Sequence, residues 1–156
     1  MPASDTDNPG VIAFPPLLVT GTLLLGLVAH WLWPRHAFPT TAARVAGIAF
    51  VVAGAALIAW GARTMRQGGT NIDPRQPALA LVSGGPFRWS RNPLYLALII
   101  LYIGIALLFD ALWPLVLLVP LVAVLEWGVI RREERYLTHK FGAPYEAYRS
   151  KVRRWF

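Results

Sequence analysis

The chain has 156 residues with a formal net charge of +7, and 56% of them are hydrophobic while only 15% are charged. Soluble domains are about one-quarter charged, and their apolar residues alternate with polar faces; here the apolar residues form long blocks rich in Leu, Ala and Val. The sequence therefore excludes an ordinary soluble domain. It predicts an all-α integral membrane protein with about four transmembrane helices, because a helix of roughly 20 apolar residues spans the hydrocarbon layer with its backbone satisfied.

The absence of cysteine excludes disulfides, thiolate zinc sites and cysteine nucleophiles. The histidines are scattered along the chain without ligand spacing, so we expect no metal site; they are His30, His36 and His139. A nucleic-acid partner would require a basic patch on a soluble domain, and we expect none.

The N-terminal part predicts a flexible polar tail over residues 1–10 and two membrane spans within residues 11–62. The start of the chain is acidic and the apolar run after it is long, unlike a signal peptide, so no cleavage is expected. The first span covers about 11–33 and the second about 42–62. Small residues are frequent in the second span, which predicts the close approach of another helix.

A loop over residues 63–93 follows; Gly and Pro break it repeatedly, and such long loops are often functional. The third span, about 94–109, is short for a full crossing. Only Asp110 and Ala111 separate it from the fourth span, about 112–130, so the two spans are expected to form a tight C-terminal helical hairpin. Asp110 is expected to be a turn residue on the far side of the membrane.

From residue 131 the chain is highly charged but keeps a helical period, which predicts a cytoplasmic amphipathic tail broken near Gly142 and Pro144. The first connection carries two Lys or Arg residues, the long loop five and the tail eight. Because the loops richest in Lys and Arg stay in the cytoplasm, we expect both termini to be cytoplasmic in a bacterial-type inner membrane. The apolar stripe of the tail consists of Tyr136, Leu137, Phe141, Tyr145 and Tyr148.

One polar cluster precedes the third span and another follows the fourth, so both lie at the open end of the hairpin. The short turn therefore predicts that Arg91 and Tyr95 lie near Glu133 and Glu134 at the membrane surface. Such a site could bind a zwitterion, with guanidinium for its carboxylate and carboxylates for its ammonium.

Glu126 lies several residues inside the fourth span, where a carboxylate is costly and usually has a function. It precedes Glu133 by seven residues, which predicts that the two share a helix face. A protonated Glu126 in an interhelical hydrogen bond is an equally weighted alternative. The Glu133–Glu134 pair could also be a solvated helix end paired with neighbouring arginines, and Arg88 and Arg91 could be simple membrane anchors.

The segment that enters the third span reads Gly85-Pro86-Phe87-Arg88-x-x-Arg91-Asn92-Pro93-x-Tyr95. It resembles the Gly-Pro-Tyr-Arg-x-x-Arg-His-Pro-x-Tyr-x-Gly motif of isoprenylcysteine carboxyl methyltransferases, and the related phospholipid methyltransferases share much of that pattern. The tail is similar to a second signature of the family and reads Glu133-Glu134-x-x-Leu137-x-x-x-Phe141-Gly142-x-x-Tyr145-x-x-Tyr148-x-x-x-Val152-x-Arg154-Trp155. Residues 69–74 look like the approach segment of bacterial members. The resemblance makes residues 63–156 the methyltransferase-like catalytic half of a single membrane domain, residues 1–156.

The resemblance implies S-adenosylmethionine as methyl donor, bound in a cytoplasmic pocket, and a tunnel from the bilayer for a lipophilic acceptor. The expected cofactor-binding residues are Arg91, Asn92, Pro93, Leu94, Tyr95, Glu133 and Glu134. The expected catalytic residues are Arg91, Glu133 and Glu126. The expected substrate-binding residues are Arg88, Trp127 and Arg154, of which Arg154 belongs to the C-terminal closure of the site.

The chain departs from the family pattern at Asn92, which replaces a His, at Ala97, which replaces a Gly, and in having fewer spans than eukaryotic members. Asn92 can form hydrogen bonds but cannot act as a base. Methyl transfer needs little acid–base help, because the sulfonium is a good leaving group and a carboxylate or thiolate acceptor is already a nucleophile. An amine acceptor would have to lose a proton, and Glu126 or Glu133 would then serve as the base.

An isoprenylcysteine-type carboxylate is the acceptor that the resemblance favours, with phospholipid amines, small thiols and isoprenoid acids left open. A membrane reductase of the sterol reductase type, using NADPH, is the alternative enzyme, although the loop and tail are short for a dinucleotide. A third possibility is a non-catalytic membrane scaffold whose basic tail binds anionic lipid. Binding of S-adenosylmethionine, of NADPH or of neither separates the three.

Overall fold

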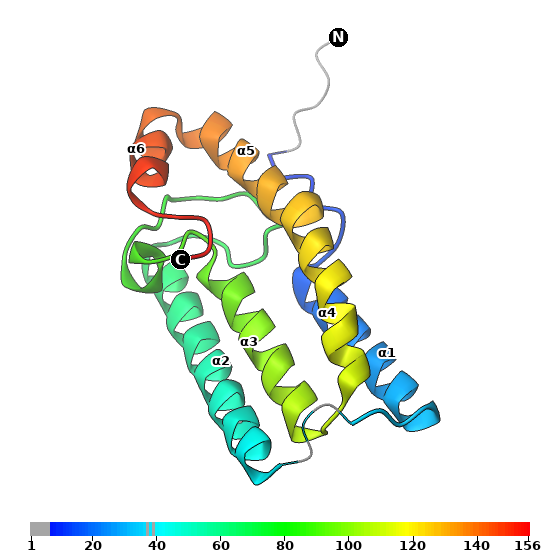
Figure 1. The fold of residues 1–156 in the computed structure, drawn as a ribbon. Coiled ribbons are helices and arrows are strands. Elements are labelled where there is room, and N and C mark those ends of the chain that lie inside the picture. The colour runs from blue at the N-terminus through cyan, green and yellow to red at the C-terminus, as the bar shows by residue number, and fades with distance from the viewer. Residues whose placement is uncertain (1–6, 37, 39) are drawn as a thin grey trace.

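The structure, a computed structural model, describes residues 7–36, 38 and 40–156, and every regular element in that part of the chain is helical (Figure 1). The elements are α1 (Pro15–Leu32), α2 (Thr41–Gln67), the 3-10 turn η1 (Gly85–Arg88), α3 (Pro93–Leu108), α4 (Leu112–Leu125), the π-helical turn η2 (Glu126–Ile130), α5 (Arg131–Phe141) and α6 (Ala143–Lys151). The predicted all-α fold is confirmed.

The long helices run alternately up and down, with α2 beside α3 and α1 beside α4 (Figure 1). Three of them are long and apolar enough to cross a membrane: α1 with 18 residues, α2 with 27, and the continuous helix Leu112–Phe141 with 30. The fourth, α3, has 16 residues and is apolar but shorter. The prediction of about four transmembrane helices, with a third one short for a full crossing, is roughly consistent with these three long helices and the shorter α3.

Several predicted helix ends are corrected by the structure. Helix α1 begins at Pro15, four residues later than expected, because prolines favour the first turn of a helix. Helix α2 continues to Gln67 before Gly68 caps it, since the residues after position 62 still favour a helix. The last membrane helix continues past residue 130 to Phe141, so the first part of the charged tail extends that helix directly.

Glycines on α2 allow close packing against α3. Gly47, Gly54 and Gly61 are buried and recur every seven residues, so they lie on one helix face. A Cβ added to Gly54 would lie 2.9 Å from the carbonyl oxygen of Ala97, and one on Gly47 would lie 2.9 Å from that of Gly104. The predicted close approach of another helix to this span is confirmed.

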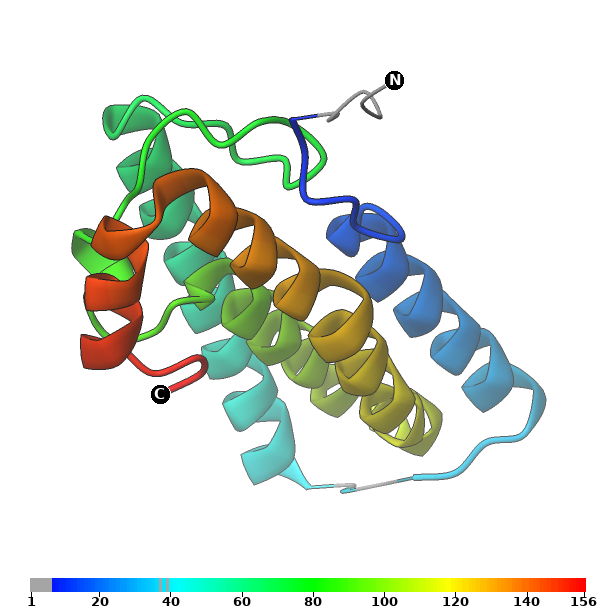
Figure 2. The same ribbon diagram turned by 90° about the horizontal axis from the view of Figure 1, so that it is seen from above.

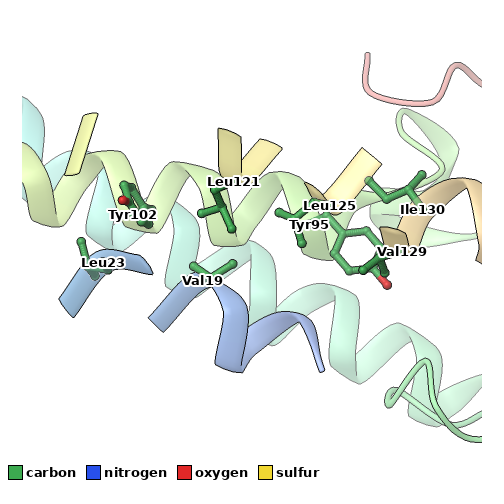
Figure 3. Packing of buried hydrophobic residues seen from close by; sticks show 8 residues of the cluster. All are labelled: Val19, Leu23, Tyr95, Tyr102, Leu121, Leu125, Val129 and Ile130. Carbon is green, nitrogen blue, oxygen red and sulfur yellow. The ribbon is translucent and has the colours of Figure 1, made fainter. Parts of the chain in front are cut away.

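A cluster of buried apolar side chains joins α1, α3 and α4 (Figure 3). The cluster extends to Val129 and Ile130 in η2, near the end of the bundle that carries the long loop. The buried Tyr102 hydroxyl donates to the carbonyl oxygen of Pro114 at 2.8 Å, which ties α3 to α4 inside the hairpin. The members of the cluster are Val19, Leu23, Tyr95, Tyr102, Leu121, Leu125, Val129 and Ile130.

The hairpin turn between α3 and α4 contains Asp110, whose φ of 51° lies in the left-handed region. This confirms the prediction of a turn residue. The Asp110 carboxylate also accepts a hydrogen bond from the backbone N–H of Phe38 at 2.7 Å, and its other oxygen lies 2.8 Å from Nδ1 of His36. Asp110 therefore links the hairpin turn to the connection between α1 and α2.

Candidate functional site

The long loop, α5, α6 and the C-terminal segment gather at the other end of the bundle, at the start of α3 (Figures 1 and 2). Two side-chain contacts between the start of α3 and α5 define this end. The Arg91 guanidinium lies 3.0 Å from a carboxylate oxygen of Glu134, with both side chains 8% exposed, and the Tyr95 hydroxyl donates to Glu133 at 2.6 Å. The prediction that Arg91 and Tyr95 lie near Glu133 and Glu134 is confirmed.

The π-helical turn η2 sets the direction of the carboxylates on the last helix. A π turn contains an extra residue compared with an α turn, so residues eight apart across it come to share a face. Glu126 and Glu134 accordingly contact the same guanidinium, that of Arg154, at 2.6 and 2.7 Å. Glu133 instead faces α3, so the expectation that Glu126 and Glu133 share a face is wrong.

The C-terminal segment is fixed to the start of α3 through its backbone. The Arg91 N–H donates to the carbonyl oxygen of Arg153 at 3.0 Å. The carbonyl oxygen of Arg154 accepts from Ser90 Oγ at 3.1 Å and from the side-chain amide of Asn92 at 3.0 Å. Asn92 is 6% exposed, and in this position it serves as a hydrogen-bond donor, a role that requires no proton transfer.

A cavity with an empty volume of about 690 Å³, open solvent included, lies under the long loop; its lining is mixed, and we call it the polar cavity after Asn71, Gln76 and Glu134. Residues 70–82 of the loop form one side of it, and α5 and α6 contribute Glu134, Tyr136 and Tyr145. The loop is held in shape by its own side chains, since Thr70 Oγ1 accepts from the N–H of Leu79 at 3.0 Å.

An apolar cavity with an empty volume of about 950 Å³ adjoins the polar one. Its walls are apolar side chains at the start of α1, on α2 and on α3, which are Phe14, Pro15, Pro16, Ile58, Ala62, Leu94 and Leu98. Eight residues line both cavities and form their shared wall: Met65, Ile72, Asp73, Pro74, Phe87, Arg91, Asn92 and Glu133. Tyr95 lies on the apolar side of this wall.

The charged groups of the shared wall differ in how far they are neutralised. Asp73 binds the Arg75 guanidinium, with 2.6 Å between the closest atoms, and this contact lowers the pKa of the Asp73 carboxyl. Arg91 is paired with Glu134, but its Nε is buried without a hydrogen-bond partner among the described residues. Glu133 forms no ion pair with any described residue. Its carboxylate accepts a hydrogen bond from the Tyr95 hydroxyl.

The structure places all seven residues expected to bind the cofactor at one or both cavities. Six of them line the apolar cavity, and Glu134 lines the polar one; the six are Arg91, Asn92, Pro93, Leu94, Tyr95 and Glu133. In contrast, Glu126, Arg88, Trp127 and Arg154 line neither cavity. Trp127 is 59% exposed on the outside of the bundle, and Arg154 contacts the site through Glu134 and, by its carbonyl oxygen, through Asn92.

Sequence reasoning missed the contribution of the N-terminal segment. Phe14 and the two prolines after it line the apolar cavity, whereas the sequence predicts for them only a place in the first span. Asp7 accepts a hydrogen bond from the Tyr136 hydroxyl at 2.7 Å and pairs with Lys140 at 2.7 Å. No local pattern predicts these contacts, since they join residues about 130 positions apart. The rest of the tail expected over residues 1–10, residues 1–6, lies outside the described part of the chain.

A sequence model of one protein family, described as phospholipid methyltransferase, matches residues 42–144. The matched range includes nearly all of α2, the long loop, α3, α4, η2 and α5, and therefore every residue that lines the polar cavity except Pro9, Tyr145 and Tyr148. No curated protein and no solved structure matches the chain.

Proposed function

Because this chain belongs to the phospholipid methyltransferase family, whose members use S-adenosylmethionine as methyl donor, we propose that it methylates a lipophilic acceptor at the wall shared by its two cavities. The observation that carries the proposal is the adjacency of a polar and an apolar cavity, with Glu133 and Arg91 lining both. A water-soluble donor and a lipid acceptor need two such compartments that meet at one point.

The unpaired groups of the polar cavity suit a zwitterionic donor. The buried Arg91 Nε is a hydrogen-bond donor without a partner among the described residues, and it would bind a carboxylate. Glu133 would bind a positive charge, because it is a carboxylate without a cationic partner in that part of the chain. S-adenosylmethionine supplies a methyl group on a sulfonium, so the protein need not activate the leaving group.

The apolar cavity suits the hydrocarbon part of the acceptor. It is formed where α1, α2 and α3 approach the loop end of the bundle; α1 and α2 are long and apolar enough to cross a membrane, and α3 is apolar but shorter. An acceptor that enters from the bilayer would keep its apolar chain among Phe14, Leu94 and Leu98. Its reacting group would then lie beside Tyr95 and Glu133.

The charges at the shared wall favour an amine over a carboxylate as the reacting group. The isoprenylcysteine-type carboxylate expected from the resemblance would lie beside Glu133, which forms no ion pair with a described residue, and like charges repel. An amine has no such penalty, and Glu133 would accept the proton that it loses. Glu126, the other candidate base, lines neither cavity and is bound by Arg131 and Arg154 at 2.9 and 2.6 Å.

For the membrane orientation we propose that the loop end of the bundle is cytoplasmic. The long loop, α5 and α6 carry most of the Lys and Arg residues and lie together at that end (Figure 1). Both termini would then be cytoplasmic, in a bacterial-type inner membrane. A C-terminal reporter that is active only outside the membrane would contradict this orientation.

The first test is calorimetric titration of the detergent-purified protein with S-adenosylmethionine, with NADPH as the control ligand. We expect saturable binding of S-adenosylmethionine and none of NADPH. The absence of binding to a folded sample would contradict the proposal.

The second test is methyl transfer from labelled S-adenosylmethionine to phosphatidylethanolamine and to a farnesylcysteine carboxylate. Glu133→Gln should lower transfer to the amine by about a hundredfold, the usual contribution of a positioned base. Glu146→Gln, an exposed change on α6, is the matched control. Faster transfer to the carboxylate than to the amine would contradict the amine assignment while leaving the methyltransferase assignment intact.

A further inference from the structure

A basic groove lies between α5 and the N-terminal segment; it shares Pro9 and Tyr136 with the polar cavity but none of the residues of the wall between the two cavities. Its empty volume is about 1130 Å³, and it is open to the surface. Arg132, Arg135 and His139 recur at intervals of three and four residues and therefore lie on one face of α5. The residues that line this basic groove are Asp7, Asn8, Pro9, Gly10, Arg132, Arg135, Tyr136, His139 and Lys140.

The basic groove has more positive than negative charge. Arg132, Arg135 and Lys140 are its permanent cations, and Asp7 is its carboxylate. Arg132 donates to the carbonyl oxygen of Gly10 at 3.0 Å, which leaves its charge uncompensated. Arg135 forms no hydrogen bond or ion pair with any residue that the structure describes, and its side chain is exposed.

Asp7 shows which chemistry the basic groove accepts. Both of its carboxylate oxygens lie close to Nζ of Lys140, at 2.8 and 2.7 Å, and one also accepts from the Tyr136 hydroxyl. An oxyanion therefore already occupies the Lys140 end of the groove. The other end of the groove, at Arg132 and Arg135, is also cationic and therefore attracts anions. No described carboxylate lines that end.

The position of the basic groove along the last helix matches the depth of lipid phosphates. The continuous helix Leu112–Phe141 has 30 residues, which corresponds to about 45 Å, whereas the hydrocarbon layer is about 30 Å thick. Its apolar part ends at Ile130, where α5 begins. The headgroup layer adds roughly 5–8 Å on each side, so Arg132 and Arg135, in the first two turns of α5, lie within it.

We propose that the basic groove is a binding site for the phosphate group of an anionic membrane lipid, bound by the guanidinium groups of Arg132 and Arg135. Guanidinium groups bind phosphate oxygens through two parallel hydrogen bonds, and a headgroup with a net negative charge compensates the excess positive charge. This site is separate from the wall shared by the two cavities, so it does not depend on the acceptor of the methyl group.

The test is native mass spectrometry of the full chain in detergent, titrated with phosphatidylglycerol or with phosphatidylcholine. We expect retained phosphatidylglycerol and at least about a fivefold weaker retention in Arg132→Gln/Arg135→Gln. The matched control is Arg149→Gln/Lys151→Gln, which removes the same charge from exposed positions on α6 and should bind as the parent does. The single variant Arg135→Gln breaks no hydrogen bond or ion pair with a described residue, so it tests the site at an exposed position.

Three results would overturn this assignment. Equal losses in the α5 and α6 double variants would show a general charge effect and no site. Equal retention of phosphatidylglycerol and phosphatidylcholine by the parent would show that the negative charge is not recognised. Inorganic phosphate that saturates the protein at millimolar concentration, without retention of phosphatidylglycerol, would assign the groove to a free anion instead of a lipid.

Discussion

Arg154 and Glu134 form a bidentate ion pair in which Nε and Nη2 of the guanidinium lie 3.0 and 2.7 Å from the two carboxylate oxygens. The same carboxylate binds Arg91 at 3.0 Å, and the same guanidinium binds Glu126 at 2.6 Å. These contacts join the C-terminal segment, α5, η2 and the residues that precede α3. Because Arg91 lines both cavities, the ion pair also fixes one side of the proposed active site.

Glu134→Gln should destabilise the protein as well as weaken donor binding. Glu134 is 8% exposed, and the substitution would leave Arg91 and Arg154 without their shared anion. Breaking a buried ion pair by removing one partner typically costs about 3 kcal/mol or more. Thermal unfolding in detergent should show a clearly lower midpoint than for Glu146→Gln, the exposed control on α6. Equal midpoints for the two variants would show that the cluster does not stabilise the fold.

The sequence predicts the helical bundle and the meeting of the two polar clusters, because both follow from apolar blocks and one short turn. The chain reverses direction at Asp110 and Ala111, so α3 and α4 are antiparallel. The start of α3 therefore lies beside the end of the last helix. The π turn at Glu126 does not follow from such patterns. It coincides with the contact between Glu126 and Arg154, 28 residues further along the chain, and local periodicity contains no information about that partner.

Gly54→Ala should destabilise the packing of α2 on α3, although Ala is the better helix former. The added Cβ would lie 2.9 Å from backbone atoms of Ala97 and Leu101, which cannot move without separating the helices. Overpacking of this kind costs about 1–3 kcal/mol. The matched control is Gly21→Ala on α1, where nothing lies within 4 Å of the new methyl group. Unfolding midpoints in detergent should fall for Gly54→Ala and stay level or rise for Gly21→Ala; the opposite order would refute the close contact.

Tyr145→Phe should make stability less sensitive to alkaline pH. The pKa of Tyr145 is raised to about 12, mainly by burial and to a smaller extent by the nearby negative charge of Glu134. A tyrosine in the unfolded chain ionises near pH 10, so the stabilisation is fully present below about pH 10 and is lost as the pH rises through about 12. The unfolding midpoint of the parent should fall over that interval, and that of Tyr145→Phe should fall less. Burial also raises the pKa of Tyr148, so some decline should remain in the variant.

Tyr136→Phe should shorten the residence time of a ligand in the polar cavity. The Tyr136 hydroxyl donates to Asp7 at 2.7 Å and accepts from the backbone N–H of Ala78 at 3.1 Å and from Lys140 at 3.0 Å. One donor and two acceptor positions are therefore all used, and they join α5, the long loop and the N-terminal segment. Tyr136 itself and Pro9 line the polar cavity, so this junction closes part of it.

Loss of the junction should raise the dissociation rate of S-adenosylhomocysteine about fivefold, the effect of roughly 1 kcal/mol from a hydrogen bond. Asp7→Asn tests the same junction from the other side, because it weakens the contacts of residue 7 with Lys140 and Tyr136 and leaves the contact between Tyr136 and Ala78 in place. Its effect should be smaller than that of Tyr136→Phe and in the same direction. Release measured by rapid mixing that is equally fast in the parent and in both variants would show that the segment before α1 does not close the cavity.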